Sequence, residues 1–420
     1  MLNAITNAFR VPELRKKILF TLAMIAVYRL GAYIPVPGVD IKAVQALVNS
    51  NAALGLLGLF SGGALEKFAV FSLGIMPYIT SSIIMQLLQG VIPKVEQWAK
   101  EGETGQRKIT QITRYMTLGI ALLQSIAMLG VFRGAIKQGT GAGTPPQFFT
   151  DLVIVITLIA GTAFIMWMGE LITQRGVGNG MSLLIFASII SRFPQAIVQS
   201  FTFANGILTI LLLFMTVFIV AAIVTMERAQ RRIPVQYAKR VVGRRVYGGS
   251  GTYIPLKING ANVVPIIFAS AILFFPSQIA VLTGNVTLQQ IGNWLARGPL
   301  NWVLEFGLIV FFTYFYTALV FNPIDLSDNL RKNGGFIPGV RPGSATTRYI
   351  ENVLNRITLP GALFLGVIAV VPSMLFYTTN DPLVSSFGGT SILIMVGVAL
   401  ETMTQLESQL KMRHYDGFFK

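Results

Sequence analysis

Ten long, mostly apolar stretches, separated by charged residues, dominate this sequence. They lie at 18–34, 74–92, 115–134, 152–172, 181–200, 206–226, 263–284, 303–321, 357–376 and 389–406. Each stretch is long enough to be a membrane span, because crossing about 30 Å of hydrocarbon as an α-helix takes roughly 20 apolar residues. Only 12% of the 420 residues are charged, whereas soluble domains carry roughly 25%. The sequence therefore predicts an all-α membrane protein with ten transmembrane helices.

The basic residues predict how the chain is oriented. With the N-terminus in the cytoplasm, 26 of the 33 Lys and Arg residues fall in cytoplasmic segments. Lys and Arg are retained on that side of a membrane, so both termini are expected to be cytoplasmic. The first apolar stretch has no small-residue cleavage site after it and is expected to stay as a span.

Three segments do not resemble simple lipid-exposed helices. The stretch 74–92 contains Pro77 and several hydroxyl and amide side chains, which are costly against lipid, so this helix is expected to face protein or water. Arg192 and Pro194 interrupt the fifth stretch. Residues 55–73 are rich in glycine and too short to span. A re-entrant or half-buried helix is expected there, since such backbone is tolerated at depth only inside protein or beside a water-filled cavity; an interfacial helix on the outer surface is the alternative.

Two long cytoplasmic loops are expected, at about 227–262 and 322–356. The first carries eight basic residues and the second a turn-rich string from Gly334 to Gly343. Long loops in compact bundles usually have a function. Eight basic residues are more than orientation requires, so the first loop is interpreted as a docking surface for an anionic partner, such as ribosomal RNA or an acidic protein face. The alternative is that these residues only enforce topology.

Signals for catalysis are scarce. The chain has no cysteine and a single histidine, His414, which excludes disulfides and thiolate metal sites. We expect no enzyme activity, no catalytic residue, no metal and no cofactor. The acids Asp151, Glu170, Glu305 and Glu401 fall near span ends, whereas a secondary transporter normally has ionisable groups near the midplane. An ion-coupled solute transporter is the alternative function.

A series of short motifs is shared with a known family. They are Phe60–Leu65, Leu73–Ile79, Gly176–Gly180, Arg231–Arg232, Tyr237–Arg240, Gly243–Arg245, Leu256–Lys257, Phe336–Gly343 and Gly388–Ser391. In this order and spacing they make the whole chain resemble the SecY family, the pore subunits of bacterial protein-translocation channels. The resemblance implies two pseudo-symmetric five-helix halves, 1–200 and 201–420, around a central pore.

The resemblance also implies a ring of aliphatic side chains at the pore constriction. The matching residues are Ile79, Ile83, Ile185, Ile189, Ile267 and Ile394. A hydrophobic constriction excludes water and ions and can gate by dewetting. Without the family match these isoleucines would be read as ordinary packing or lipid contacts.

Three further sets of residues take roles from the same resemblance. The segment 55–73 resembles the plug that rests against the ring from outside, with the motif Phe60, Ser61, Gly62, Gly63, Ala64 and Leu65. The second and seventh spans resemble the lateral gate, through Thr80, Ser82, Gln86, Ser270, Phe274 and Gln278. Docking of a motor or ribosome is implied for Arg231, Arg232, Lys239, Arg240, Arg244, Arg245 and Arg341.

The implied function is translocation of unfolded secretory polypeptides across the bacterial plasma membrane, with lateral release of membrane segments into lipid. The implied partners are SecE-like and SecG-like small membrane subunits, the motor ATPase SecA, the ribosome and signal-sequence-bearing substrates. Energy would then come from the partner. The tail 407–420 matches loosely, so no docking role is assigned to it.

Overall fold

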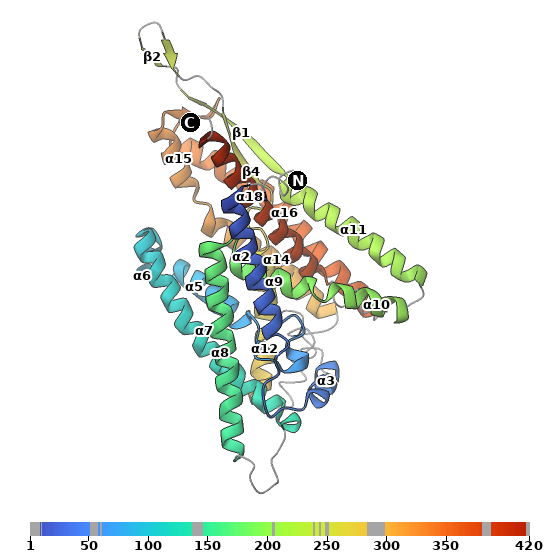
Figure 1. Cartoon of the computed structure of the whole chain (residues 1–420). Helices are drawn as coiled ribbons and strands as arrows, with labels where there is room; N and C mark the ends of the chain where they lie inside the picture. Colours follow the sequence, from blue (N-terminus) through green and yellow to red (C-terminus); the bar gives the residue numbers. More distant parts are fainter. Residues whose placement is uncertain are drawn as a thin grey trace.

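The computed structural model describes residues 9, 11–50, 58, 61–136, 146–203, 206–237, 240–242, 245–247, 252–283, 299–379 and 388–416. Most of these residues are helical (Figure 1). The helices are α2 (Pro12–Gly31), α3 (Ile41–Ser50), α5 (Met76–Val91), α6 (Pro93–Lys100), α7 (Glu103–Val131), α8 (Gln147–Arg175), α9 (Gly180–Ile190), α10 (Phe193–Phe203), α11 (Gly206–Arg228), α12 (Val264–Thr283), α14 (Pro299–Val320), α15 (Pro323–Lys332), α16 (Ser344–Thr379) and α18 (Gly389–Asp416), with short 3-10 turns η1 (Leu65–Lys67) and η2 (Arg133–Ala135).

Every expected span coincides with a helix or a pair of helices. Within the described ranges, seven segments are long and apolar enough to cross a membrane: Glu103–Val131, Gln147–Arg175, Gly180–Thr202, Thr209–Arg228, Pro299–Lys332, Ser344–Leu375 and Gly389–Met412. The other three expected spans fall on α2, α5 and α12. The chain is therefore a multi-pass membrane protein with the helical fold that the sequence predicts.

The helix α5 is short for a span. Its 16 residues reach about 24 Å at 1.5 Å per residue, less than the hydrocarbon thickness. It ends at Val91 because Pro93 follows, which restricts Ile92 to an extended conformation with φ −101° and ψ 113°. It packs against α6 and α7, so its polar side chains have protein neighbours.

The fifth span is broken where the sequence predicts. The helix α9 ends at Ile190, and α10 begins at Phe193. Arg192 lies in the turn between them, and Pro194 follows in the first turn of α10, where proline is tolerated because the N–H groups have no partner there.

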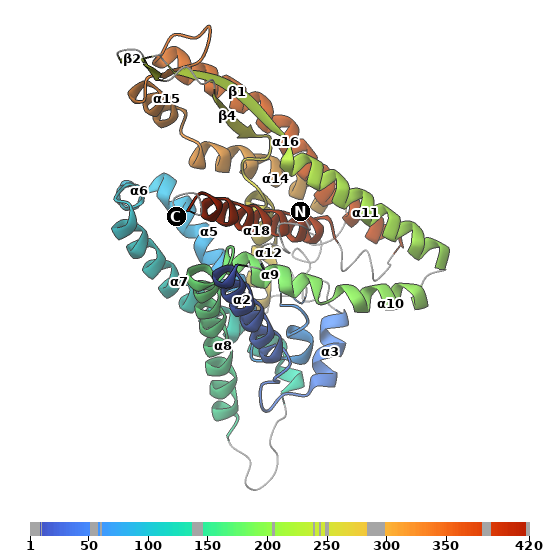
Figure 2. The ribbon, with the colours of Figure 1, turned by 45° about the horizontal axis from the view of Figure 1, so that its top comes forward.

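Helices from distant parts of the sequence pack together in the centre. The helix α9 packs against α18, and α7 packs against α12. In both views α10 and α11 project from the side opposite α6 and α7 (Figures 1 and 2). Leu14 of α2, Val177 and Leu406 of α18 form one small cluster, so the start of α2 and the end of α18 lie at the same end of the molecule. The division into halves 1–200 and 201–420 stays a prediction.

The two long loops form one folded unit rather than separate irregular segments. Strand β1 (Gln230–Tyr237) pairs antiparallel with β4 (Thr252–Lys257) and with β5 (Gly335–Phe336), while β2 (Arg240–Val242) pairs with β3 (Arg245–Tyr247). We call β1–β5, α15 and the start of α16 the β-loop unit. Its core consists of Ile233, Val235, Leu256, Leu330, Ile337, Ile350 and Leu354.

The β-loop unit extends from one end of the helical body (Figures 1 and 2). The sequence did not predict its small sheet, because β1 carries two arginines and contains Pro234. The helix α16 also begins at Ser344, well before the span expected at 357.

Candidate functional site

The six isoleucines of the expected ring belong to one apolar cluster. Five are almost fully buried, with at most 7% of each exposed: Ile79, Ile83, Ile185, Ile189 and Ile394. Ile267 is partly buried and packs against the same cluster, while its neighbour Ile266 is fully buried. The structure therefore brings together side chains from α5, α9, α12 and α18.

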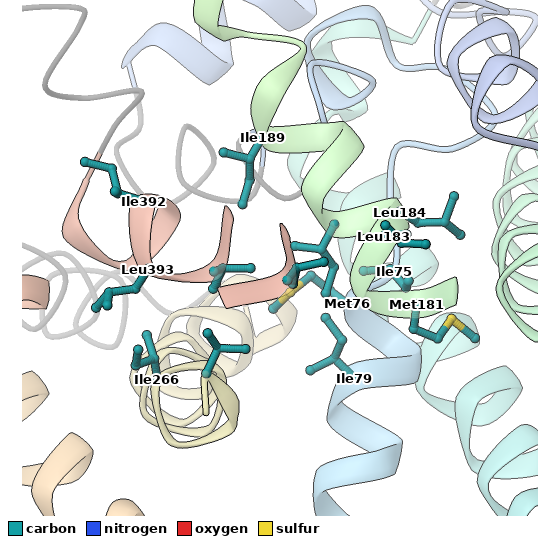
Figure 3. Packing of buried hydrophobic residues seen from close by; sticks show 14 of the residues in the cluster. Ile75, Met76, Ile79, Met181, Leu183, Leu184, Ile189, Ile266, Ile392 and Leu393 are labelled. Carbon is teal, nitrogen blue, oxygen red and sulfur yellow. The ribbon is translucent and has the colours of Figure 1, made fainter. Parts of the chain in front are cut away.

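Figure 3 shows how the four helices converge. Ile79 of α5, Ile189 of α9, Ile266 of α12 and Leu393 of α18 surround one region. Met76 also lies in it (Figure 3), and sequence reasoning missed both Ile266 and Met76. No sequence signal separates them from other apolar residues of membrane helices, because packing against protein and against lipid both favour such side chains.

The described part of the expected plug is buried against this cluster. Ser61, Ala64 and Leu65 are almost fully buried, and Ala64 belongs to the same cluster as the isoleucines. Gly62 and Gly63 have φ values of 63° and 86°, a region that glycine enters without strain. Phe60 lies outside the described residues.

Hydrogen bonds within this segment hold a turn. The Ser61 hydroxyl donates to the carbonyl oxygen of Gly58 at 3.1 Å and accepts from the Leu65 N–H at 3.2 Å. The expected half-buried helix is wrong for residues 61–73, which form turns and the short η1. The segment is nevertheless enclosed by protein rather than lying on an outer surface.

Among the described residues, α5 and α12, which carry the expected lateral-gate residues, have no extensive contact with each other. The helix α12 packs mainly against α7 and α14, and α5 packs against α7. The hydroxyls of Thr80 and Ser270 donate to carbonyl oxygens of their own helices, at 3.0 Å and 2.9 Å. Gln86 donates to Ser82 at 3.4 Å, and its oxygen is buried without a partner. The side chains of Phe274 and Gln278 lie outside the described part.

The expected docking residues lie on the β-loop unit. Arg231 and Arg232 are exposed on β1, and the Arg232 guanidinium lies 4.8 Å from the centre of the Tyr253 ring. Arg341 is exposed just before α16. Strands β2 and β3 contain Arg240 and Arg245; their side chains, together with Lys239 and Arg244, fall outside what the structure describes.

Three basic residues of the α6–α7 hairpin differ from these arginines. They form the ion pairs Lys100–Glu96, Arg107–Glu103 and Lys108–Glu101, at 2.6, 2.8 and 3.1 Å. The hydrogen bond that Lys100 donates to Glu96 raises the pKa of Lys100. Arg231, Arg232 and Arg341 form no ion pair within the described ranges. Their charges are thus free to attract an anionic partner.

Comparisons with known proteins agree on one family. The SecY family model matches residues 69–403. The protein translocase subunit SecY of Streptomyces galbus is 50% identical over 437 residues, and the SecY subunit of Mycobacterium bovis is 46% identical over 444 residues; each alignment covers 100% of both chains.

Solved structures with the same fold are more distant in sequence. A protein-conducting channel superposes with a TM-score of 0.65 and 16% identity, covering 94% of this chain and 92% of that one. The Sec61 protein of a canine ribosome–channel complex superposes with a TM-score of 0.60 and 16% identity, with the same coverage.

Proposed function

The chain belongs to the SecY family, and on that premise we propose that it is the channel-forming subunit of a bacterial protein translocase. It passes unfolded secretory polypeptides across the plasma membrane and releases membrane segments sideways into lipid. The observation that carries the proposal is the convergence of isoleucines from α5, α9, α12 and α18 on one apolar cluster (Figure 3). Full-length relatives named as translocase subunits support it.

The apolar cluster acts as the constriction of the channel. Aliphatic side chains keep water out, so the resting constriction does not conduct ions. An extended polypeptide can part these side chains without forming hydrogen bonds that would select its sequence. Ala64 of the buried segment Ser61–Leu65 belongs to the cluster, and this segment reinforces the seal as the plug.

The seam at α12 serves as the lateral gate. The hydroxyls of Thr80 and Ser270 are satisfied within their own helices, so parting α12 from its neighbours leaves these hydrogen bonds intact. Polar contacts between membrane helices are worth only about 0.6 kcal/mol on average. A signal sequence can therefore open this seam by replacing apolar contacts with its own.

The β-loop unit receives the partner that drives transport. The exposed Arg231, Arg232 and Arg341 suit ribosomal RNA phosphates or an acidic face of a motor ATPase resembling SecA. The related Sec61 protein comes from a ribosome–channel complex, which supports the ribosome as a partner. Small membrane subunits resembling SecE and SecG complete the complex, both termini face the cytoplasm, and the chain itself hydrolyses nothing.

Crosslinking to a stalled, partly exported polypeptide tests the proposal. A photoreactive residue at Ile79 or Ile267 should crosslink to the stalled chain. The same residue at Ile207 of α11, which is 84% exposed and expected to face lipid, should not. Equal crosslinking at all three positions, or none at Ile79 and Ile267, would contradict a central passage. Ion-coupled uptake of a small solute by the purified protein would favour the transporter instead.

A further inference from the structure

We propose that Arg29 and Arg192 are positioning residues that clasp the tip of the plug, while its root stays fixed during transport. The plug tip is Gly58 with residues 61–67, and the plug root is residues 68–73. This inference rests on the proposed function and defines which part of the plug moves.

Two arginines from different helices reach the plug tip. Arg192, between α9 and α10, forms an ion pair with Glu66. Arg29, near the end of α2, donates from Nη1 to the carbonyl oxygen of Gly62 at 3.0 Å. The tip is therefore held at two points, once through a side chain and once through the backbone.

The tip lies directly on the junction of α2 and α9. The Tyr28 and Ser188 hydroxyls, one from each helix, are 2.6 Å apart and hydrogen-bonded. A Cβ on Gly62 would lie 3.0 Å from the Cα of Ser188, which is tighter than most packed contacts, and its φ of 63° also favours glycine. The tip thus occupies a fixed place within reach of both arginines.

The plug root is held by its backbone. The Val36 N–H donates to the carbonyl oxygen of Phe68, and the Val70 N–H donates to that of Ile34, both at 2.9 Å. These bonds join the root to the segment after α2 in the manner of a short antiparallel ladder. Val36 and Phe68 are both buried, so breaking the bond between them would leave buried polar groups unpaired.

Close packing also fixes the root. The Phe71 ring stacks on Tyr28 and Phe164, with centroids 5.7 and 6.0 Å away. A Cβ on Gly161 of α8 would overlap the carbonyl oxygen of Val70, so α8 and the root are in direct backbone contact. Moving the root would break this packing as well as its hydrogen bonds.

The two parts therefore differ in what displacement costs. Freeing the tip from the surrounding helices breaks the Arg192–Glu66 ion pair and the hydrogen bond from Arg29, and water in an open channel can replace both. It also breaks the hydrogen bonds that the Ala64 carbonyl oxygen accepts from the Ala69 N–H and the Ser72 hydroxyl, and it exposes Ala64 and Leu65. Freeing the root gives up backbone hydrogen bonds and aromatic packing that water does not replace. The plug accordingly opens by movement of the tip about Phe68, whose φ of 43° marks the boundary.

Charge variants test the clasp in the complete channel complex reconstituted in vesicles. Glu66→Gln and Arg192→Gln should each raise the resting ion conductance about fivefold, which corresponds to ~1 kcal/mol. The exchanged pair Glu66→Arg with Arg192→Glu should return it toward the original value. Arg133→Gln, at an exposed arginine of η2, is the matched control and should change nothing. Single variants that conduct like the unmodified channel would overturn the clasp.

Thiol crosslinks separate the tip from the root, since the chain has no other cysteine. A cleavable crosslinker between Glu66→Cys and Arg192→Cys should block export until it is cleaved. A disulfide between Pro35→Cys and Ala69→Cys, which face each other in an antiparallel bridge, should leave export unchanged. Blocked export in the second variant would overturn the fixed root. Failure of the unmodified channel to export any reporter would instead refute the proposed function.

Discussion

The central apolar cluster and the β-loop unit bury their side chains by different rules. In the β-loop unit, the apolar residues of β1 point to a small core and Arg231 and Arg232 stay exposed, as in a soluble domain. In the helices around the central cluster, apolar residues are found both buried and exposed. Ile394 is fully buried and Ile207 is 84% exposed, yet both are isoleucines of membrane helices. Residue type therefore predicts position along β1 but not in the helical body.

A polar substitution in the central cluster should have the largest effect. Ile394→Asn places an amide among aliphatic side chains and lets water enter the constriction. We expect the resting ion conductance of reconstituted channels to rise by about tenfold or more. Ile207→Asn on α11 is the matched control with the same chemical change. Equal conductance of the two variants would show that the cluster is not the seal.

A cavity-forming substitution in the core of the β-loop unit should affect that unit and leave the central apolar cluster unchanged. Ile233→Ala should destabilise the unit by about 2–5 kcal/mol, since Ile233 is almost fully buried. Protease cleavage within residues 230–257 should increase and partner-driven export should fall, while the resting conductance stays unchanged. Gln236→Ala, at an exposed position of the same strand, controls for the change in strand composition. A rise in conductance would mean that the two regions are coupled.

Reversing a charge on the β-loop unit should have a smaller effect that depends on the partner. Arg341 is exposed and lies in the turn before α16, so Arg341→Glu should preserve the fold. We expect post-translational secretion to fall about tenfold and cotranslational insertion to fall less, because a charge pair at a docking surface alters association with its own partner. Arg341→Lys should restore most of the secretion. Equal loss of post-translational secretion and of cotranslational insertion would contradict a role of Arg341 that is specific to one partner.

Removing the Gln86 amide, whose buried oxygen has no partner, should have the smallest effect. Gln86→Leu replaces a side chain whose oxygen is buried without a partner, and a change of about 0.6 kcal/mol alters an equilibrium less than about threefold. We expect a changed threshold for export of reporters with weak signal sequences and no change for strong ones. Unaltered export of the weak-signal reporters would argue against a role at the gate.

The positions of the spans followed from the sequence because the hydrocarbon thickness sets helix length. The break in the fifth span was also predicted, since Arg192 and Pro194 both disfavour a continuous apolar helix there. The segment 55–73 was recognised as irregular from its glycines, although the turns at 61–73 were expected to be a helix.

The tertiary structure decided which residues meet. A membrane helix is apolar on its lipid side and on its protein side, so the sequence could not distinguish Ile266 from Ile267 or identify the inward faces without the family resemblance. The pairing of β1 with β5 and of Arg192 with Glu66 joins residues far apart in the chain. Local sequence carries no signal for such pairs, because the two partners come into contact only after the intervening helices have packed.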